Sequence, residues 1–216
     1  MIRVKTISGG LLPTNCYLFV DERTGKAAVV DPGFLSEELE QAVQQVGVEN
    51  VEAILLTHGH YDHIMGVPMI KEMTGAKIYI HQEDAAFTSN SDLNLSRMIA
   101  ARQCVPFTAD VILQEGDTLM VGEVPVKLIN TPGHTRGSSC YLVEDALFTG
   151  DTLMRGTMGR TDFQTGSPIE MQKSLARLRD LPGDYRVYPG HGEESTMEYE
   201  RAYNPFLRNA TDDFDT

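Results

Sequence analysis

Four potential metal ligands fall within six consecutive positions of this chain, in the segment from His58 to His63. The imidazole of histidine and the carboxylate of aspartate both bind first-row metal ions at neutral pH. A segment this short cannot close all four ligands around one ion without strain, so two neighbouring ions are the simpler interpretation. We therefore expect His58 and His60 to serve one ion, and Asp62 and His63 to serve the other. Each ion then needs further ligands that only the fold can bring close.

Further candidate ligands occur just after short apolar runs that are typical of buried strands. The runs at 51–56, 124–129, 146–149 and 186–188 lead into His58, His134, Asp151 and His191, respectively. Glycine or proline beside each of them permits a sharp turn, and loops along one rim of a sheet often carry functional residues. We predict that these loops meet at one edge of a sheet.

The predicted partition gives each ion three protein ligands. The first ion takes His58, His60 and His134, and the second takes Asp62, His63 and His191. Asp151 has two carboxylate oxygens and is predicted to bridge the ions. Histidine and aspartate together suit Zn, Fe(II) or Mn. We expect two divalent ions per chain, with Zn preferred and Fe or Mn as alternatives.

The rest of the chain reads as strands mixed with helices. Strands are predicted at 2–7, 15–20, 27–30, 51–56, 77–80, 118–121, 124–129, 139–143, 146–149 and 186–188. Helices are predicted after the N-cap Ser36, at 67–74, at 91–103 and from the capping box that begins at Ser167. The sixth histidine, His81, has no partner motif and is predicted to be structural or at the surface. This order of elements predicts one α/β domain over residues 1–216.

Composition narrows the possible partners. The net charge of −13 repels nucleic acids and anionic membranes, so neither is expected as a partner. No window approaches the roughly 18 apolar residues of a membrane span, and no signal peptide is recognised, so the expected location is the cytoplasm. Cys16, Cys104 and Cys140 lack the spacing of a metal site and are predicted to be buried reduced thiols. The sequence does not predict an oligomeric state.

Four motifs together resemble those of the metallo-β-lactamase superfamily. They are His58–His63, Thr131–Thr135, Gly150-Asp151 and Pro189–Gly192. The resemblance extends from about Thr14 to Leu207, which is nearly the whole chain. It implies an α/β fold of the αββα type, in which two mixed sheets lie face to face, helices cover their outer faces and the metals bind at one edge.

Within the superfamily, the chain most resembles single-domain glyoxalase II-type proteins, which are similar to hydroxyacylglutathione hydrolases. Residues 158–163 and the tripeptide Asn204-Pro205-Phe206 carry this resemblance. Asp151 resembles the bridging aspartate of such hydrolases. The β-lactamases of the common zinc class have cysteine near this position, so β-lactam hydrolysis is not expected.

The resemblance implies hydrolysis of a small acyl-thiol substrate, a thioester such as S-lactoylglutathione. A hydroxide held between the two ions would attack the thioester carbonyl, and Asp62 would orient it while binding the second ion. Arg160 lies where the family has a basic residue that contacts glutathione, and Phe163 corresponds to an aromatic contact. No general acid is required, because the pKa of a free thiol is only about 8.5.

Two other functions fit the same residues. Residues 159–164 and 181–184 also resemble persulfide dioxygenases of this fold, which hold one iron with two histidines and one aspartate. The matching positions here are His58, His134 and Asp151. A non-catalytic metal-binding module is the second alternative, but structural metals are usually closed by four protein ligands. Metal stoichiometry and oxygen uptake separate the dioxygenase from the hydrolase.

Overall fold

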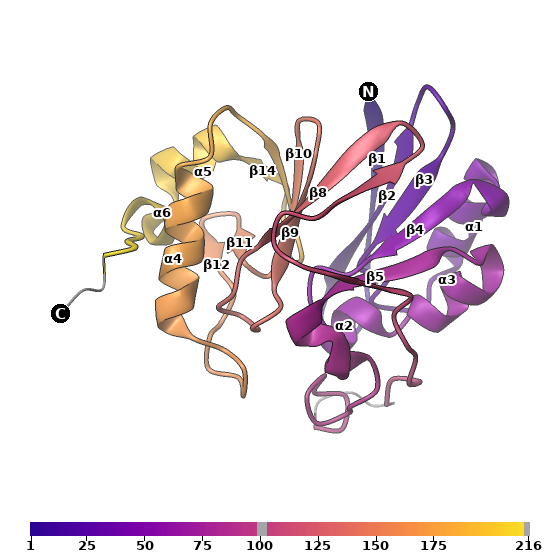
Figure 1. The fold of residues 1–216 in the computed structure, drawn as a ribbon, viewed down its shortest axis with the longest axis horizontal. Helices are drawn as coiled ribbons and strands as arrows, with labels where there is room; N and C mark the ends of the chain where they lie inside the picture. Colours follow the sequence, from indigo (N-terminus) through magenta and orange to yellow (C-terminus); the bar gives the residue numbers. More distant parts are fainter. Residues whose placement is uncertain (99–102, 214–216) are drawn as a thin grey trace.

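Two sheets lie face to face in the computed structural model, which describes residues 1–98 and 103–213 (Figure 1). In the described residues, the first sheet has six strands in the order of the sequence. They are β1 (Ile2–Gly9), β2 (Thr14–Asp21), β3 (Ala27–Val30), β4 (Val51–Leu55), β5 (Lys77–His81) and β6 (Val111–Leu113). The pairs from β1 to β3 are antiparallel and those from β3 to β6 are parallel. The sheet is therefore mixed.

The second sheet is mixed as well. Its six strands within the described residues run in the order β14 (Ser195–Thr196), β13 (Arg186–Pro189), β10 (Ala146–Gly150), β9 (Ser139–Val143), β8 (Val124–Asn130) and β7 (Thr118–Val121). Only β10 and β13 pair in parallel. A small hairpin, β11 (Leu153–Met154) and β12 (Thr157–Met158), follows β10. The predicted α/β fold with two mixed sheets face to face is confirmed.

Helices cover the outer face of each sheet (Figure 1). The α-helices are α1 (Glu37–Val46), α2 (Tyr61–Ile64), α3 (Val67–Thr74), α4 (Pro168–Arg179), α5 (Met197–Tyr203) and α6 (Pro205–Arg208). The 3₁₀ helices are η1 (Val48–Asn50) and η2 (Gln82–Thr88). Helices α1 and α3 pack on the first sheet, and α4, α5 and α6 pack on the second. No helix in the described ranges combines the length and the hydropathy that a membrane crossing requires.

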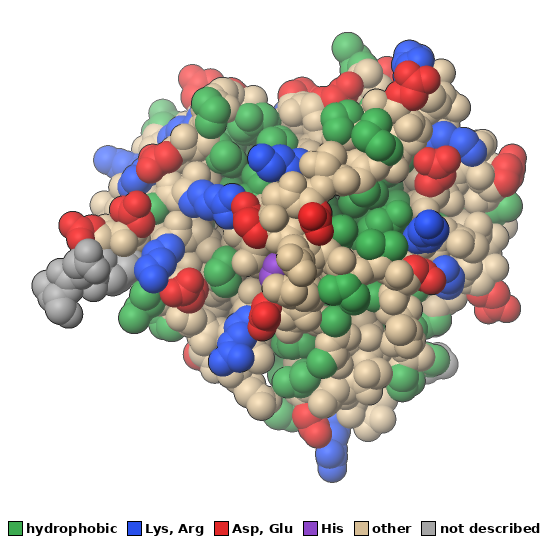
Figure 2. All heavy atoms as spheres, in the orientation of Figure 1, with side chains coloured by type: hydrophobic (Ala, Val, Ile, Leu, Met, Phe, Trp, Pro, Cys, Tyr) green, Lys and Arg blue, Asp and Glu red, His purple; other side chains and the backbone are tan. Residues whose placement is uncertain are grey.

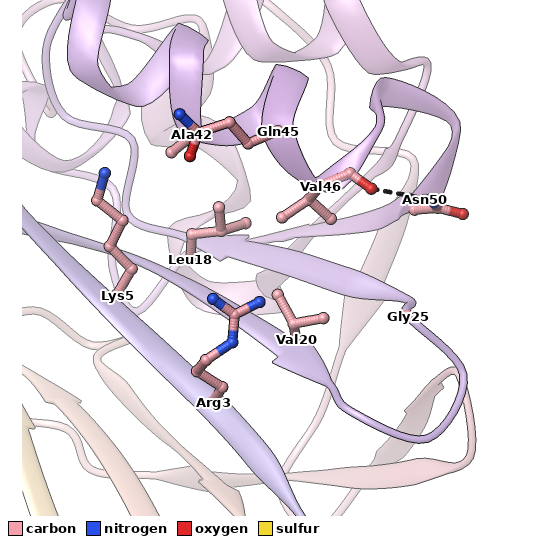
Figure 3. A pocket seen from close by; sticks show the side chains of 9 residues that line it. All are labelled: Arg3, Lys5, Leu18, Val20, Gly25, Ala42, Gln45, Val46 and Asn50. Carbon is pink, nitrogen blue, oxygen red and sulfur yellow. Dashed lines mark hydrogen bonds between the residues drawn. The ribbon is translucent and has the colours of Figure 1, made fainter.

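Local sequence signals explain the two longest helices. Ser36 accepts a hydrogen bond from the N–H of Leu39 at 3.3 Å and so caps α1, as N-cap serines typically do. Figure 3 shows Ala42 and Val46 of α1 facing Leu18 and Val20 of β2. Helix α4 is capped in the same way, because Ser167 accepts a hydrogen bond from the N–H of Glu170 at 3.2 Å.

Aromatic rings fill the space between the sheets. Tyr17 and Phe19 of the first sheet meet Phe148 of the second, with ring centroids 5.4 and 5.6 Å apart. Phe148 also stacks on Tyr188 at 5.1 Å. These fully or almost fully buried side chains make the inter-sheet core. They fix the position of each strand end, and therefore of the loops that follow.

One predicted helix is wrong where the structure describes it. Residues 91–98 form turns, and residues 99–102 of the predicted helix lie outside the described residues. Asn90 Oδ1 accepts from the N–H groups of Asp92 and Leu93, and Asn94 Oδ1 accepts from that of Ser96. Such side-chain bonds to the backbone compete with helix formation. Leu95 also has a φ of +66°, which a helix cannot contain.

Candidate metal centre

The predicted ligands leave strands that run in the same direction. Strand β8 and strand β10 are both antiparallel to β9, and β10 is parallel to β13. Their C-terminal ends therefore lie along one edge, where His134, Asp151 and His191 follow. In the facing sheet, β4 delivers His58 to the same place, and α2 carries Asp62. The seven predicted ligands thus come from segments that follow strands of both sheets. They meet at one rim and surround a shared centre.

The first predicted group is assembled as expected. One ring nitrogen from each of His58, His60 and His134 lies within 4.8 Å of the others. His60 Nδ1 and His134 Nε2 are only 2.9 Å apart. All three side chains are buried. Three imidazole nitrogens that converge in a buried position form a suitable face for one divalent ion.

The second predicted group is assembled in the same way. Ligand atoms of Asp62, His63 and His191 lie within 4.8 Å of one another. His191 Nε2 is 3.4 Å from Asp62 Oδ2. His191 is the most exposed side chain of the set, at 25%. The second group therefore reaches solvent through His191, whereas His63 is fully buried.

Asp151 lies between the two groups. Its Oδ1 is 3.4 Å from His63 Nε2, and its Oδ2 is 3.5 Å from both His134 Nε2 and His191 Nε2. One carboxylate thus faces ligands of both predicted ions. A bridging role for Asp151 remains our prediction, and its position suits that role.

Several buried polar atoms at this centre lack a hydrogen-bond partner among the residues that the structure describes. His58 Nε2, His63 Nε2 and Asp151 Oδ1 are buried without a hydrogen bond to any described residue. Unpartnered buried polar atoms are costly, and these three are metal-ligand atoms that face one another. Divalent metal ions would satisfy them, so the residues present fit the metals that the sequence predicts.

Some of the ligand groups already have the charge state that metal binding requires, whereas the His63 and His191 rings would have to lose a proton to bind a metal ion. Burial lowers the pKa of His58 well below its ordinary value and that of His60 to about 3, so both rings are neutral and offer lone pairs. Burial alone would raise the pKa of Asp151, but the charge of His63 and a hydrogen bond from His191 hold it well below its ordinary value. Burial alone would lower the pKa of His191, but hydrogen bonds to Asp151 and Asp62 raise it to about 10.

Sequence analysis missed Asp31, which holds part of this centre in place. Asp31 accepts hydrogen bonds from the N–H and the hydroxyl of Thr57, at 2.8 and 2.6 Å, and lies 2.9 Å from His63 Nδ1. A carboxylate on the far nitrogen of a ligand histidine fixes its tautomer and orientation. Asp31 has a φ of +49°, a strained conformation that is often found at functional sites.

Asp84 is a second residue that sequence analysis missed. It is fully buried and accepts three hydrogen bonds: from the N–H of Gly59 at 2.9 Å, from Thr135 Oγ1 at 2.7 Å and from the N–H of Gly137 at 2.8 Å. Asp84 therefore joins the loop of His58 and His60 to the loop of His134. Both Asp31 and Asp84 closely follow strands of the same parallel set, β3 and β5. The pattern that identified the ligands, a polar residue shortly after the end of a strand, would also have identified Asp31 and Asp84.

The remaining predicted residues are placed as follows. Arg160 and Phe163 border a cavity of about 560 Å³ that opens beside the metal centre. The Phe163 ring centroid is 5.2 Å from that of His60. His81 is buried and accepts a hydrogen bond from the N–H of Glu83 at 3.4 Å, so its predicted structural role fits. The three cysteines are buried and free, as predicted.

A substitution at Gly190 would test how tightly the side chains of the metal centre are packed. A Cβ at this position would lie 2.2 Å from Asp151 Oδ1 and 2.7 Å from His63 Cε1. We expect Gly190→Ala to displace both side chains and to weaken metal binding at least about tenfold, as measured by competition with a chromogenic chelator. Gly192→Ala in the same loop is the control for backbone strain without a clash, because its Cβ would meet nothing within 4 Å although its φ of +78° is strained for alanine. Equal metal affinity in the two variants would contradict the packing argument.

Comparison with known proteins identifies the family. The family model described as the metallo-β-lactamase superfamily matches residues 9–191. The chain belongs to this superfamily. An uncharacterised protein of Aquifex aeolicus is 38% identical over 94% of this chain and 96% of its own length. The hydroxyacylglutathione hydrolase GloC of Haemophilus influenzae is 32% identical, with 90% and 93% covered.

Three solved structures superpose on almost the whole chain. BLEG-1, described as a B3 metallo-β-lactamase, has a TM-score of 0.85 at 31% identity, with 95% of this chain and 99% of that one covered. TTHA1623 in a di-iron-bound form has a TM-score of 0.82 at 32% identity, with 94% and 99% covered. ETHE1 from Myxococcus xanthus has a TM-score of 0.75 at 30% identity, with 94% and 83% covered.

Proposed function

We propose that this superfamily member is a dinuclear metal-dependent thioesterase, a hydrolase of the glyoxalase II type. The observation that carries the proposal is the pair of three-ligand groups around Asp151, which open directly onto a cavity of about 560 Å³. The similarity to the hydrolase GloC supports a hydroxyacyl thioester as the first substrate to test. S-lactoylglutathione is that substrate.

Two divalent ions would supply hydroxide at neutral pH, because metal binding lowers the pKa of water to about 7. The residues of this chain contribute position and charge. Asp62 borders the cavity, and its carboxylate lies 3.4 Å from the hydroxyl of Thr14 and 3.4 Å from His191 Nε2. Burial alone would raise the pKa of Asp62, but the charge of His63 and a hydrogen bond from His191 lower it, so it stays ionised. An ionised Asp62 at the cavity wall can accept a hydrogen bond from a water molecule and orient that water towards the substrate carbonyl.

The first test joins metal analysis to turnover. Protein purified without added metal is analysed for Zn, Fe and Mn, and thiol release from S-lactoylglutathione is followed before and after removal of metal by a chelator. We expect close to two metals per chain, hydrolysis that disappears with the metal, and recovery when Zn is restored. Two bound metals without hydrolysis of any thioester would refute the proposed activity.

The alternative is a mononuclear iron dioxygenase that acts on persulfides, as the sequence also suggests. The resemblance of residues 159–164 and 181–184 to persulfide dioxygenases favours retaining it, although Asp62, His63 and His191 also converge and provide a second set of ligand atoms. One iron per chain with oxygen uptake on glutathione persulfide would support it. The similarity to BLEG-1 adds a chromogenic β-lactam to the same panel. A non-catalytic metal-binding module is the expectation if no compound in the panel is turned over.

A further inference from the structure

Outside the predicted ligands, the cavity beside the metal centre is lined mainly by apolar side chains, together with Tyr61 and Arg160. Its described lining contains five apolar side chains: Leu12, Pro13, Leu95, Met154 and Phe163. Figure 2 shows a small area of histidine near the middle of one face, with hydrophobic side chains close by. A separate cavity beneath α1 has a volume of about 340 Å³, is bordered by Arg3 and Lys5 (Figure 3), and contains no predicted ligand. Substrate recognition therefore belongs to the apolar cavity.

Two features hold the apolar walls in place. Leu95 is only 7% exposed and keeps its position with a φ of +66°, a costly conformation for a leucine. Elsewhere in the lining, His134 Nδ1 lies 2.7 Å from the backbone oxygen of Arg160. A Cβ at Gly159 would lie 1.8 Å from the backbone oxygen of Asp151. The segment that carries Phe163 is thus packed directly against the metal centre.

Arg160 is the only lysine or arginine among the described residues that line this cavity, and Asp162 pairs with it. Arg160 Nε and Nη2 donate to the two oxygens of Asp162, each at 2.7 Å. The guanidinium also lies over the Phe163 ring, 4.3 Å from its centroid. The Nε and Nη2 edge of the guanidinium is therefore paired with a neighbouring, exposed carboxylate, and its face lies over an aromatic ring. A carboxylate of glutathione would have to compete with Asp162 for it.

We infer that this cavity selects thioesters with an apolar acyl chain on an uncharged thiol carrier, in preference to glutathione thioesters. The inference rests on the proposed thioesterase function. In the reaction, one water molecule adds its oxygen to the acyl carbon, the carbon–sulfur bond breaks, and the products are a carboxylic acid and a free thiol. The net charge of −13 acts in the same direction, because it disfavours a carrier with a net negative charge.

Binding tests the inference without turnover. S-hexyl-N-acetylcysteamine and S-hexylglutathione are thioethers that cannot be hydrolysed and that differ only in the carrier. We expect the uncharged carrier to bind the purified protein about tenfold more tightly by isothermal titration calorimetry. Phe163→Ala is expected to weaken binding of the hexyl group to both carriers. Equal binding of the two thioethers, or tighter binding of the glutathione derivative, would overturn the inference.

Turnover then separates this inference from the proposed function. The metal-loaded enzyme is assayed with hexanoyl-N-acetylcysteamine and S-hexanoylglutathione, and the ratio of kcat/KM for the two is expected to favour the uncharged carrier about tenfold. Asp162→Asn frees Arg160 and is expected to move this ratio several-fold towards glutathione. The control is Asp145→Asn, which removes an equally bidentate partner from Arg186, a residue outside the lining of this cavity.

The outcomes are distinct. If neither thioester is hydrolysed while the thioethers bind with the expected preference, the proposed function fails. If both are hydrolysed and glutathione is preferred or equal, the thioesterase proposal stands and the inference is wrong. A ratio that shifts equally in Asp162→Asn and Asp145→Asn would also remove Arg160 and Asp162 from the selection of substrate.

Discussion

Asp151→Ala is expected to abolish metal-dependent activity and to lose metal from both predicted positions. The reason is its place between the groups, within 3.5 Å of ligand nitrogens of His63, His134 and His191. Its removal takes away the negative charge that both ions would share. We expect turnover to fall by more than about 100-fold, which is the upper end of the effect of losing an outer partner of a ligand. Elemental analysis and thiol release measure the two effects together.

Asp180→Ala is the control for that experiment. Asp180 is an exposed aspartate after α4 that pairs with Arg179, so its removal should leave metal content and turnover unchanged. Circular dichroism of each variant checks that the fold is retained. An Asp151→Ala protein that keeps two metals and normal turnover would show that the centre does not depend on this carboxylate.

Asp84→Asn is expected to weaken metal binding although Asp84 is not a predicted ligand. An amide that replaces one carboxylate oxygen by NH₂ cannot accept all three hydrogen bonds from Gly59, Thr135 and Gly137. Both ligand loops then shift relative to one another. We expect metal affinity to fall about 10–100-fold and the free energy of unfolding to fall by about 1–3 kcal/mol. Chelator competition and urea unfolding measure the two quantities.

Asp21→Asn provides a matched control for Asp84→Asn. Asp21 is also buried and accepts from two backbone N–H groups and one hydroxyl, those of Arg23, Glu123 and Thr24. It lies at the far end of β2 from Thr14, which contacts Asp62. The Asp21 variant should lose thermal stability and keep its metal affinity. If both variants lose metal equally, Asp84 has only a general structural role.

Many of the strand and helix positions could be predicted from the amino-acid sequence because they depend on local sequence signals. Strand β3 has the predicted bounds, as does α3, and each is an apolar pattern that ends at a residue able to turn the chain. The serine caps of α1 and α4 lie where the sequence predicts them. The seven candidate ligands were found from their residue types and from their places after strands, and the structure brings them to one rim.

Sequence analysis fails where a residue's role depends on distant partners. The turns at 91–98 arise from hydrogen bonds between the side chains of Asn90 and Asn94 and nearby backbone N–H groups. These bonds compete with helix formation, and the composition of the segment does not reveal whether turns or a helix will form. Asp84 acts through Gly137, which is 53 positions away.

The sequence alone supplied the residue types of a metal centre and the order in which strands deliver them, because ligand chemistry and strand patterns are properties of single residues and their near neighbours. The tertiary structure decided what those residues face. It placed Asp151 between two groups of ligands, set Asp31 behind His63, and paired Arg160 with Asp162 at the edge of an apolar cavity. Such relations depend on how the two sheets pack, since packing alone sets the distances between loops that are far apart in the chain.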